Sequence, residues 1–309
     1  MRGNRTLGRD AWLVATARGA SLLGDEVAVM VLAWRLKGHG PTAVMALTLA
    51  LMVPTVVASP WTGMLVDRVS AKRLISWTTS VQALVCVALV FTSPAWSVAG
   101  VAALSLGSAI VNPAVGALTP RLVEREDLPR LLGLAGTFTS LGALLGPAVG
   151  GTLVAIAGTG VPLYVDAASF AAYAVMAIAL KTDRVPEPSA SGTRRRTEWA
   201  AGWLVLRNDK VLLTLQVVLM CSVLGIGAVN VAEVFFVSKT LHGNSLVYGT
   251  LGLLFGLGNL VGAVTFPRLN VKPAHRPMAA MVSAWTLAVG ILALGSSRTV
   301  WLAALAGFI

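Results

Sequence analysis

The chain has 309 residues, of which 56% are hydrophobic and only 12% charged, and its mean hydropathy is +0.78. A soluble domain normally carries about 25% charged residues, so this composition excludes an ordinary soluble protein and indicates one embedded in a lipid bilayer. The net charge of +11 does not indicate a nucleic-acid-binding protein, because the basic residues lie in short segments between apolar runs and not on one basic face.

The apolar runs predict transmembrane helices, because a helix needs about 20 apolar residues to cross the hydrocarbon core. Six such runs fill the first half of the chain, at 12–36, 42–66, 74–91, 96–118, 131–157 and 162–180. Three more follow at 211–237, 246–266 and 278–295, and a last apolar run extends from Thr299 to Ile309. We therefore predict an all-α integral membrane protein.

One long polar segment separates the two sets of helices. It contains Pro186, Pro188 and the run Arg194-Arg195-Arg196. We predict an N-terminal six-helix bundle at 1–181, a basic cytoplasmic linker at 182–210 and a partial C-terminal bundle at 211–309.

The positions of Lys and Arg predict the orientation, because basic residues concentrate in cytoplasmic loops. With the N-terminus in the cytoplasm, 19 of the 24 Lys and Arg residues lie on the cytoplasmic side, including those of the linker and of the loop at 268–276. Arg18 lies inside a predicted helix, and the four residues on the outer side are Arg35, Lys37, Lys239 and Arg298. We predict a multi-pass protein of the cell membrane with a cytoplasmic N-terminus.

The connection between the second and third helices is short and charged. Residues 63–73 read Gly-Met-Leu-Val-Asp-Arg-Val-Ser-Ala-Lys-Arg. We expect Gly63 to let the helix ends approach closely, and Asp67 to pair with a basic residue or to accept a hydrogen bond at a helix end. The basic residues of the loop are Arg68, Lys72 and Arg73.

This loop resembles the signature of the major facilitator superfamily, Gly-x-x-x-Asp-Arg-x-Gly-Arg-Arg/Lys, which joins helices 2 and 3 in that family. Ser70 stands where the family usually has Gly, and Ala71 where it often has Arg. The matching positions are Gly63, Leu65, Asp67, Arg68, Lys72 and Arg73. The resemblance implies a transporter built from two six-helix halves, with this loop taking part in gating.

The helix at 131–157 carries a second motif. Gly142, Gly146 and Gly150 recur at every fourth position and line one face of the helix, where small residues allow close packing of helices. Pro147 interrupts the helical hydrogen bonding and predicts a kink. Together with Gly151 these residues resemble the superfamily's antiporter motif, Gly-Pro-x-x-Gly-Gly, which implies export and not uptake.

Other stretches resemble the branch of the superfamily that contains macrolide and enterobactin exporters. They are Asn112-Pro113-Ala114, Pro120-Arg121-Leu122-Val123 and residues 164–170. Members of the superfamily have twelve helices, whereas nine and part of a tenth are predicted here. We therefore expect a truncated chain, whose second half is incomplete.

Charged residues inside the membrane are the candidates for transport chemistry, because ionisable groups are costly there. Arg18 and Asp25 are two turns apart on one helix, so they share a face and lie about 10 Å apart along the axis. Asp25, near mid-membrane, is the first candidate to exchange a proton for a substrate, and Glu26 is the next. Glu233 is the one acidic residue in the predicted second-half helices, and it either joins them or reaches the membrane interface.

Each of these carboxylates could instead be structural and bond to a neighbouring helix. We expect that role for Asp166, near the start of its helix, where the helix dipole favours negative charge. The two cysteines, Cys86 and Cys221, both lie in apolar runs and form no metal-ligand spacing.

The sequence has no phosphate-binding loop and no His or Cys cluster, so we predict no enzyme, no catalytic residue, no cofactor and no metal. We expect a monomeric secondary-active exporter of small, partly apolar molecules of a drug or siderophore type, coupled to proton entry. Its partners would be the substrate, protons and the bilayer. An uptake carrier of the same fold and a truncated, non-transporting membrane protein remain as alternatives.

Overall fold

The six apolar runs of the first half fold as six helices in the computed structural model. It describes residues 7–184 and 227–265, with isolated residues between 213 and 225 and between 286 and 305. The helices are α1 (Arg9–Leu36), α2 (Pro41–Arg68), α3 (Ala71–Phe91), α4 (Pro94–Leu118), α5 (Leu128–Ala157) and α6 (Gly160–Ala179). Short 3-10 turns follow α1 and α4, namely η1 (Lys37–His39) and η2 (Thr119–Arg121). These bounds lie within a few residues of the predicted ones, so the six predicted helices are confirmed.

The second half is described in part. Residues 227–235 are helical and continue into η3 (Phe236–Thr240), a π-helical segment, and α9 (Ser245–Thr265) follows after a short turn. These elements confirm portions of the helices predicted at 211–237 and 246–266. The linker after Arg184 and the loop at 268–276 lie outside the described residues, as do the apolar runs at 278–295 and 299–309 apart from isolated positions.

Local chemistry explains the tight turns between helices. Pro41 and Pro94 are the first residues of α2 and α4, where the absent N–H of proline costs nothing. The Ser70 hydroxyl accepts a hydrogen bond from the Arg73 N–H at 3.4 Å and caps α3. Gly158 ends α5 at φ +75°, a left-handed conformation that glycine adopts without strain.

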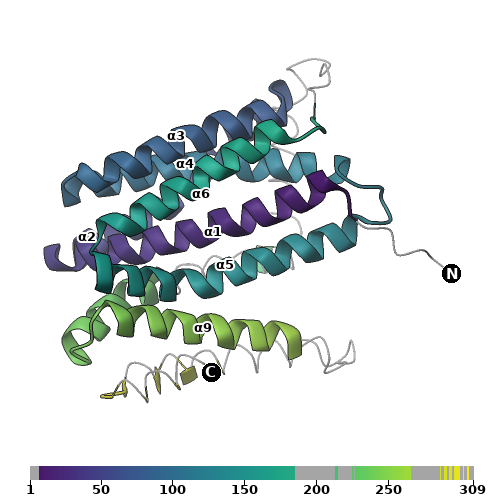
Figure 1. Cartoon of the computed structure of the whole chain (residues 1–309). Helices are drawn as coiled ribbons and strands as arrows, with labels where there is room; N and C mark the ends of the chain where they lie inside the picture. The colour runs from purple at the N-terminus through teal and green to yellow at the C-terminus, as the bar shows by residue number, and fades with distance from the viewer. Residues whose placement is uncertain are drawn as a thin grey trace.

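The helices pack in a continuous series. Each neighbouring pair in the order α3, α6, α1, α5 and α9 is in contact, and α2 packs on α4. Figure 1 shows α3 and α9 on opposite sides of the molecule, with α6, α1 and α5 between them. Among the described elements, α1 and α5 form the most extensive contact. The helix α1 thus lies at the centre, between α5 and α6.

The outward faces of the helices are apolar. On α3, Trp77, Leu84 and Phe91 recur every seven residues and are 70–77% exposed. Apolar side chains are stable in this setting only when lipid covers them. Among the residues that the structure describes, five helices, α2 to α6, are long and apolar enough to cross a membrane. The 28-residue α1 spans about 42 Å, but it does not belong to that group because its charged residues are too many; they are Arg9, Asp10, Arg18, Asp25, Glu26 and Arg35.

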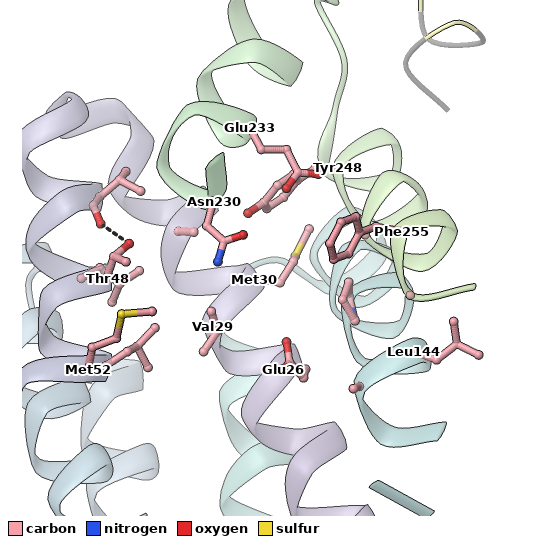
Figure 2. A pocket seen from close by; sticks show the side chains of 18 of the residues that line it. Glu26, Val29, Met30, Thr48, Met52, Leu144, Asn230, Glu233, Tyr248 and Phe255 are labelled. Carbon is pink, nitrogen blue, oxygen red and sulfur yellow. Dashed lines mark hydrogen bonds between the residues drawn. The ribbon is translucent and has the colours of Figure 1, made fainter. Parts of the chain in front are cut away.

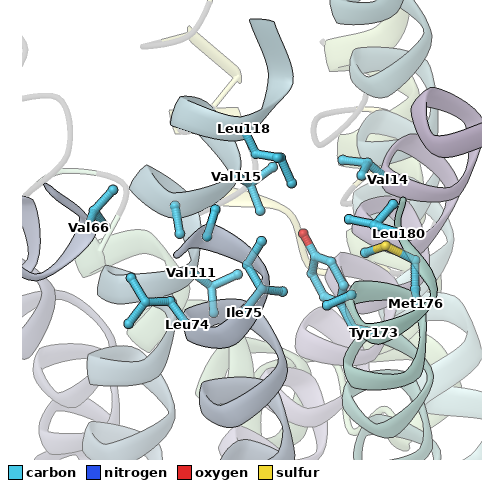
Figure 3. Packing of buried hydrophobic residues seen from close by; sticks show 13 residues of the cluster. Val14, Val66, Leu74, Ile75, Val111, Val115, Leu118, Tyr173, Met176 and Leu180 are labelled. Carbon is cyan, nitrogen blue, oxygen red and sulfur yellow. The ribbon is translucent and has the colours of Figure 1, made fainter. Parts of the chain in front are cut away.

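Two apolar clusters hold the first-half bundle together at its two ends. One joins α3, α4 and α6 near the Asp67 loop, and Figure 3 shows Ile75 beside Tyr173 at its centre. The other joins α1, α2 and α3 at the opposite end and includes Leu36 and Leu89. Both clusters consist mainly of buried aliphatic side chains, joined in the first by Tyr173, and these side chains interlock between helices and fix their relative positions.

The start of α1 is tied to the end of α6. The carboxylate of Asp10 accepts hydrogen bonds from the backbone N–H groups of Lys181 at 2.9 Å and Thr182 at 2.8 Å. Burial by itself would raise the pKa of Asp10, but these hydrogen bonds and the charge of Arg9 outweigh it, so the pKa lies below its usual 3.8. The charged carboxylate therefore stabilises the fold.

We predict that Asp10→Ala lowers the free energy of unfolding by about 1–3 kcal/mol at pH 7, because two backbone donors lose their acceptor. Since the pKa is lower in the folded state, this stabilisation is present above about pH 4 and is lost as pH falls through the folded-state pKa. Thermal unfolding in detergent at several pH values measures the difference, with the exposed Glu126→Ala as control. Equal unfolding temperatures for wild type and Asp10→Ala at pH 7 would contradict the prediction.

Candidate functional site

A cavity of about 390 Å³ lies between the two halves of the chain. Its walls come from α1, α2 and α5 of the first half and from residues 230–233 and α9 of the second. The apolar part of the wall includes Met30, Met52, Leu144 and Phe255. Methionine and aromatic side chains adapt to apolar ligands of varied shape, and a cavity of this size can enclose a small molecule.

Two carboxylates line this cavity from opposite halves. Glu26 belongs to α1 and Glu233 to the helical segment that precedes η3. Figure 2 shows them around the same space, together with Asn230, Thr48 and Tyr248. Among the described residues of the lining, these two glutamates carry the only charges. The site therefore combines a largely apolar wall with two groups able to bind a positive charge.

The glycines of α5 let α1 approach closely enough to place Glu26. A Cβ at Gly142 would lie 2.5 Å from the carbonyl oxygen of Gly19, and one at Gly150 would lie 3.2 Å from that of Val27. A Cβ at Gly146 would collide with the Cβ of Glu26. The close packing predicted for these three glycines is confirmed, and it sets the position of one cavity carboxylate.

The other side of the motif packs on α9. A Cβ at Gly249 would collide with the carbonyl oxygen of Pro147, and one at Gly151 would lie 2.5 Å from that of Ser245. Gly252 faces the ring of Pro147, which itself lines the cavity. The Gly-Pro-x-x-Gly-Gly motif is thus the contact between the two halves along one wall of the cavity.

The first candidate, Asp25, does not belong to the described cavity lining. It interacts electrostatically with Asp166 of α6, and Arg18 and Asp25 both interact with Tyr173 of the same helix. The predicted common face of Arg18 and Asp25 therefore turns toward α6. Glu26, one residue on, points about 100° away and into the cavity.

Asp166 lies deeper than the sequence analysis expected. It occupies the second turn of α6 and is only 1% exposed. Its carboxylate accepts hydrogen bonds from the Cys86 thiol at 3.1 Å and from the Ser169 hydroxyl at 3.3 Å. A Cβ at Gly24 would lie 2.6 Å from one Asp166 oxygen, so the glycine of α1 makes room for this carboxylate. The helix N-terminus is therefore not what holds it.

The Asp67 loop has a partner that sequence reasoning missed. Asp67 forms an ion pair of 3.3 Å with Arg184, which also donates a hydrogen bond to the Val66 carbonyl oxygen at 2.8 Å. The backbone N–H of Lys72 donates to Asp183 at 3.1 Å, and its ammonium donates to the Leu180 carbonyl oxygen. The loop is therefore fastened to the segment that leaves α6.

The prediction for Gly63 is not supported. In the part of the chain that the structure describes, a Cβ at this position would meet nothing within 4 Å. A close approach of helices does not explain this glycine, unlike those of α5.

The family model described as Major Facilitator Superfamily matches residues 14–309 of the chain. The chain belongs to the major facilitator superfamily. The arrangement of its helices agrees with this assignment. The structure of the nucleoside transporter NupG superposes on this chain with a TM-score of 0.72 at 12% identity, covering 97% of this chain and 78% of that one. The fold is therefore that of a superfamily member, and the chain is a multi-pass membrane protein.

Two similar relatives carry the name Macrolide efflux protein A. The one from Enterococcus faecalis is 29% identical over 189 residues, which cover 58% of each chain. The one from Streptococcus pyogenes is 27% identical over 220 residues, covering 67% of this chain and 53% of the relative. The chain thus spans little more than half the length of these relatives, whose names support the efflux branch of the superfamily.

We predict that Gly146→Val forces α1 away from α5, because the new side chain would occupy the place of the Glu26 Cβ. The variant should unfold at a lower temperature, with a loss of about 1–3 kcal/mol from overpacking. Gly133→Val on the same helix is the matched control, since a Cβ there meets nothing within 4 Å. Comparable unfolding temperatures for the two variants would show that the contact at Gly146 is not needed.

Proposed function

We propose that this protein is a secondary-active exporter that moves small, partly apolar, positively charged molecules out of the cell in exchange for protons. The observation that carries the proposal is the cavity between the two halves, with an apolar wall and two glutamates. A site at the interface of the halves suits a superfamily transporter, because movement of one half against the other can open it to either side.

The charge of the site supports a cationic substrate. Glu26 and Glu233 face the cavity from the two halves, and no basic side chain joins them in the described lining. A cation between them would relieve the cost of two negative charges in a poorly hydrated space. A neutral or anionic molecule would leave those charges without compensation.

Two features support export. The Gly-Pro-x-x-Gly-Gly motif is present at the contact between α5 and α9, and the similar relatives are named as efflux proteins. Uptake by the same fold is not favoured by these relatives. We place the protein in the cell membrane as a monomer with its N-terminus in the cytoplasm, an orientation supported by the distribution of Lys and Arg.

The proton is assigned to Asp25. This carboxylate neighbours Glu26 on α1 and interacts electrostatically with both Glu26 and Asp166. A charge that enters the cavity beside Glu26 changes the field at Asp25, so ligand binding and proton binding influence each other through adjacent residues. Glu26 and Glu233 would then hold the ligand while Asp25 carries the proton, with Arg18 on the same face of the helix.

We predict that Glu26→Gln and Glu233→Gln each weaken binding of the lipophilic cation tetraphenylphosphonium by about tenfold or more, because each removes a charge-assisted contact. Asp25→Asn should leave binding measurable but abolish the pH dependence of its affinity. In the wild type, affinity should fall as pH falls, since protons compete with the cation. Titration calorimetry of the purified protein at several pH values measures both effects.

The exposed Glu126→Gln is the control for the loss of one negative charge. Wild-type affinity in both cavity variants would exclude a cationic ligand site here. A wild-type pH profile in Asp25→Asn would instead make Asp25 structural and leave Glu26 and Glu233 as the proton-binding candidates.

We also propose that the loop of Gly63, Asp67, Arg68, Lys72 and Arg73 takes part in gating, through its attachment to residues 180–184. Asp67→Asn should weaken the pair with Arg184 by about 0.5–1 kcal/mol, because both side chains are partly exposed to solvent. That corresponds to a roughly two- to fivefold shift between inward- and outward-open states. Substrate flux in proteoliposomes should change by a similar factor, and Asp127→Asn, which removes no capping hydrogen bond, should leave it unchanged. An unaltered flux in Asp67→Asn removes the loop from the gating mechanism.

A further inference from the structure

One wall of the cavity continues into a stack of aromatic rings. The ring of Tyr248, which belongs to the cavity wall, stacks on Trp34 of α1 with centroids 5.8 Å apart and planes at 20°. The ammonium of Lys37 lies 3.0 Å from the centroid of the Trp34 ring. The stack thus joins the first half of the chain to the second.

Buried aliphatic side chains support this stack. Val237 of η3 and Leu251 of α9 are 0% and 3% exposed, and both pack in one cluster with Trp34 and Tyr248. The turn that leads into α9 is tightly held as well, since the Gly243 N–H donates to the Val237 carbonyl oxygen at 2.8 Å. The contact between the two halves at this end is therefore a packed apolar seal.

Tyr248 lines the same cavity as both carboxylates. Its side chain interacts electrostatically with Glu233 and with Glu26, and Figure 2 shows it beside Glu233 in the cavity wall. One residue thus takes part both in the packed apolar contact and in the lining of the site that holds the two glutamates. The π-helical segment η3 begins three residues after Glu233, and such segments often occur at functional positions.

We propose that the Trp34–Tyr248 stack is the gate on the Lys37 side of the cavity, and that Tyr248 is the positioning residue through which a charge bound at Glu26 and Glu233 controls this gate. The proposal rests on the function proposed above and adds a mechanism of coupling to it. A cation bound between the glutamates changes the charge around the Tyr248 hydroxyl, and the ring then takes a different position against Trp34. Opening on this side requires the two rings to separate, because they belong to different halves.

The test measures the access of a water-soluble maleimide to the cavity. Thr48→Cys places a reporter thiol on the α2 wall, in a protein that also carries Cys221→Ser. The native Cys86 is 0% exposed and serves as an internal control of folding. The full chain is reconstituted in liposomes, the reagent is added from one side at a time, and peptide mass spectrometry reports each labelled cysteine.

We expect Tyr248→Leu and Trp34→Leu to raise the labelling rate of the reporter from the Lys37 side by about fivefold, as loss of an aromatic contact between the halves favours the open state. Trp12→Leu is the matched control, because Trp12 of α1 forms an edge-to-face pair with Phe138 of α5 that lies within the first half and away from the cavity lining. It should label at the wild-type rate. Unchanged labelling in both stack variants, with Cys86 unlabelled, would overturn the gate.

Tyr248→Phe tests the coupling separately, since it keeps the ring and removes the hydroxyl. We expect it to label at the wild-type rate without ligand, and to lose the change in rate that tetraphenylphosphonium causes in the wild type. A wild-type response to the probe would overturn the role of the hydroxyl. If the probe does not bind the wild type at all, the proposed ligand fails, while the labelling of the stack variants without ligand still decides the gate.

Discussion

The close contact between α1 and α5 is the constraint on which the rest of the structure depends. The two backbones approach where Gly142, Gly146 and Gly150 face Gly19 and the stretch from Leu23 to Val27. A Cβ at Gly142 or Gly146 would collide with α1, and one at Gly150 would be tightly packed against it. This contact fixes α1 against one neighbour, and its opposite face then meets α6. Two adjacent carboxylates, Asp25 and Glu26, are thereby divided between the interior of the bundle and the cavity.

The sequence predicted the elements of the first half well, because the length and hydrophobicity of each run are set directly by the bilayer. It also predicted the packing face of α5, since glycines spaced four residues apart lie on one face of a helix. The shared face of Arg18 and Asp25 followed from the same periodicity. These features depend on residues close together in the chain, which is why a single sequence reveals them.

Features that join distant segments escaped prediction. Nothing in the loop at 63–73 indicates that Arg184 would pair with Asp67, because the pair forms only when the end of α6 lies beside α2. The neighbourhood of Asp166, Cys86 and Gly24 likewise depends on three helices meeting. Sequence spacing identified Asp25 and Glu26 as candidates, but which of the two faces the cavity depends on the tertiary packing of α1. For Gly63 the sequence predicted too much, because its place in the motif suggested a close helix contact that is absent from the described residues.

The attachment of residues 180–184 has a consequence for how the protein is made. Asp10, Val66, Asp67 and Lys72 hold this segment, and all of these partners are synthesised before it. The first bundle can therefore form these hydrogen bonds and the ion pair while the ribosome is still producing the linker, in keeping with the tendency of domains to fold as units during synthesis. The helices of the second half are synthesised later, so α9 can pack on the glycines of an α5 that already belongs to this bundle.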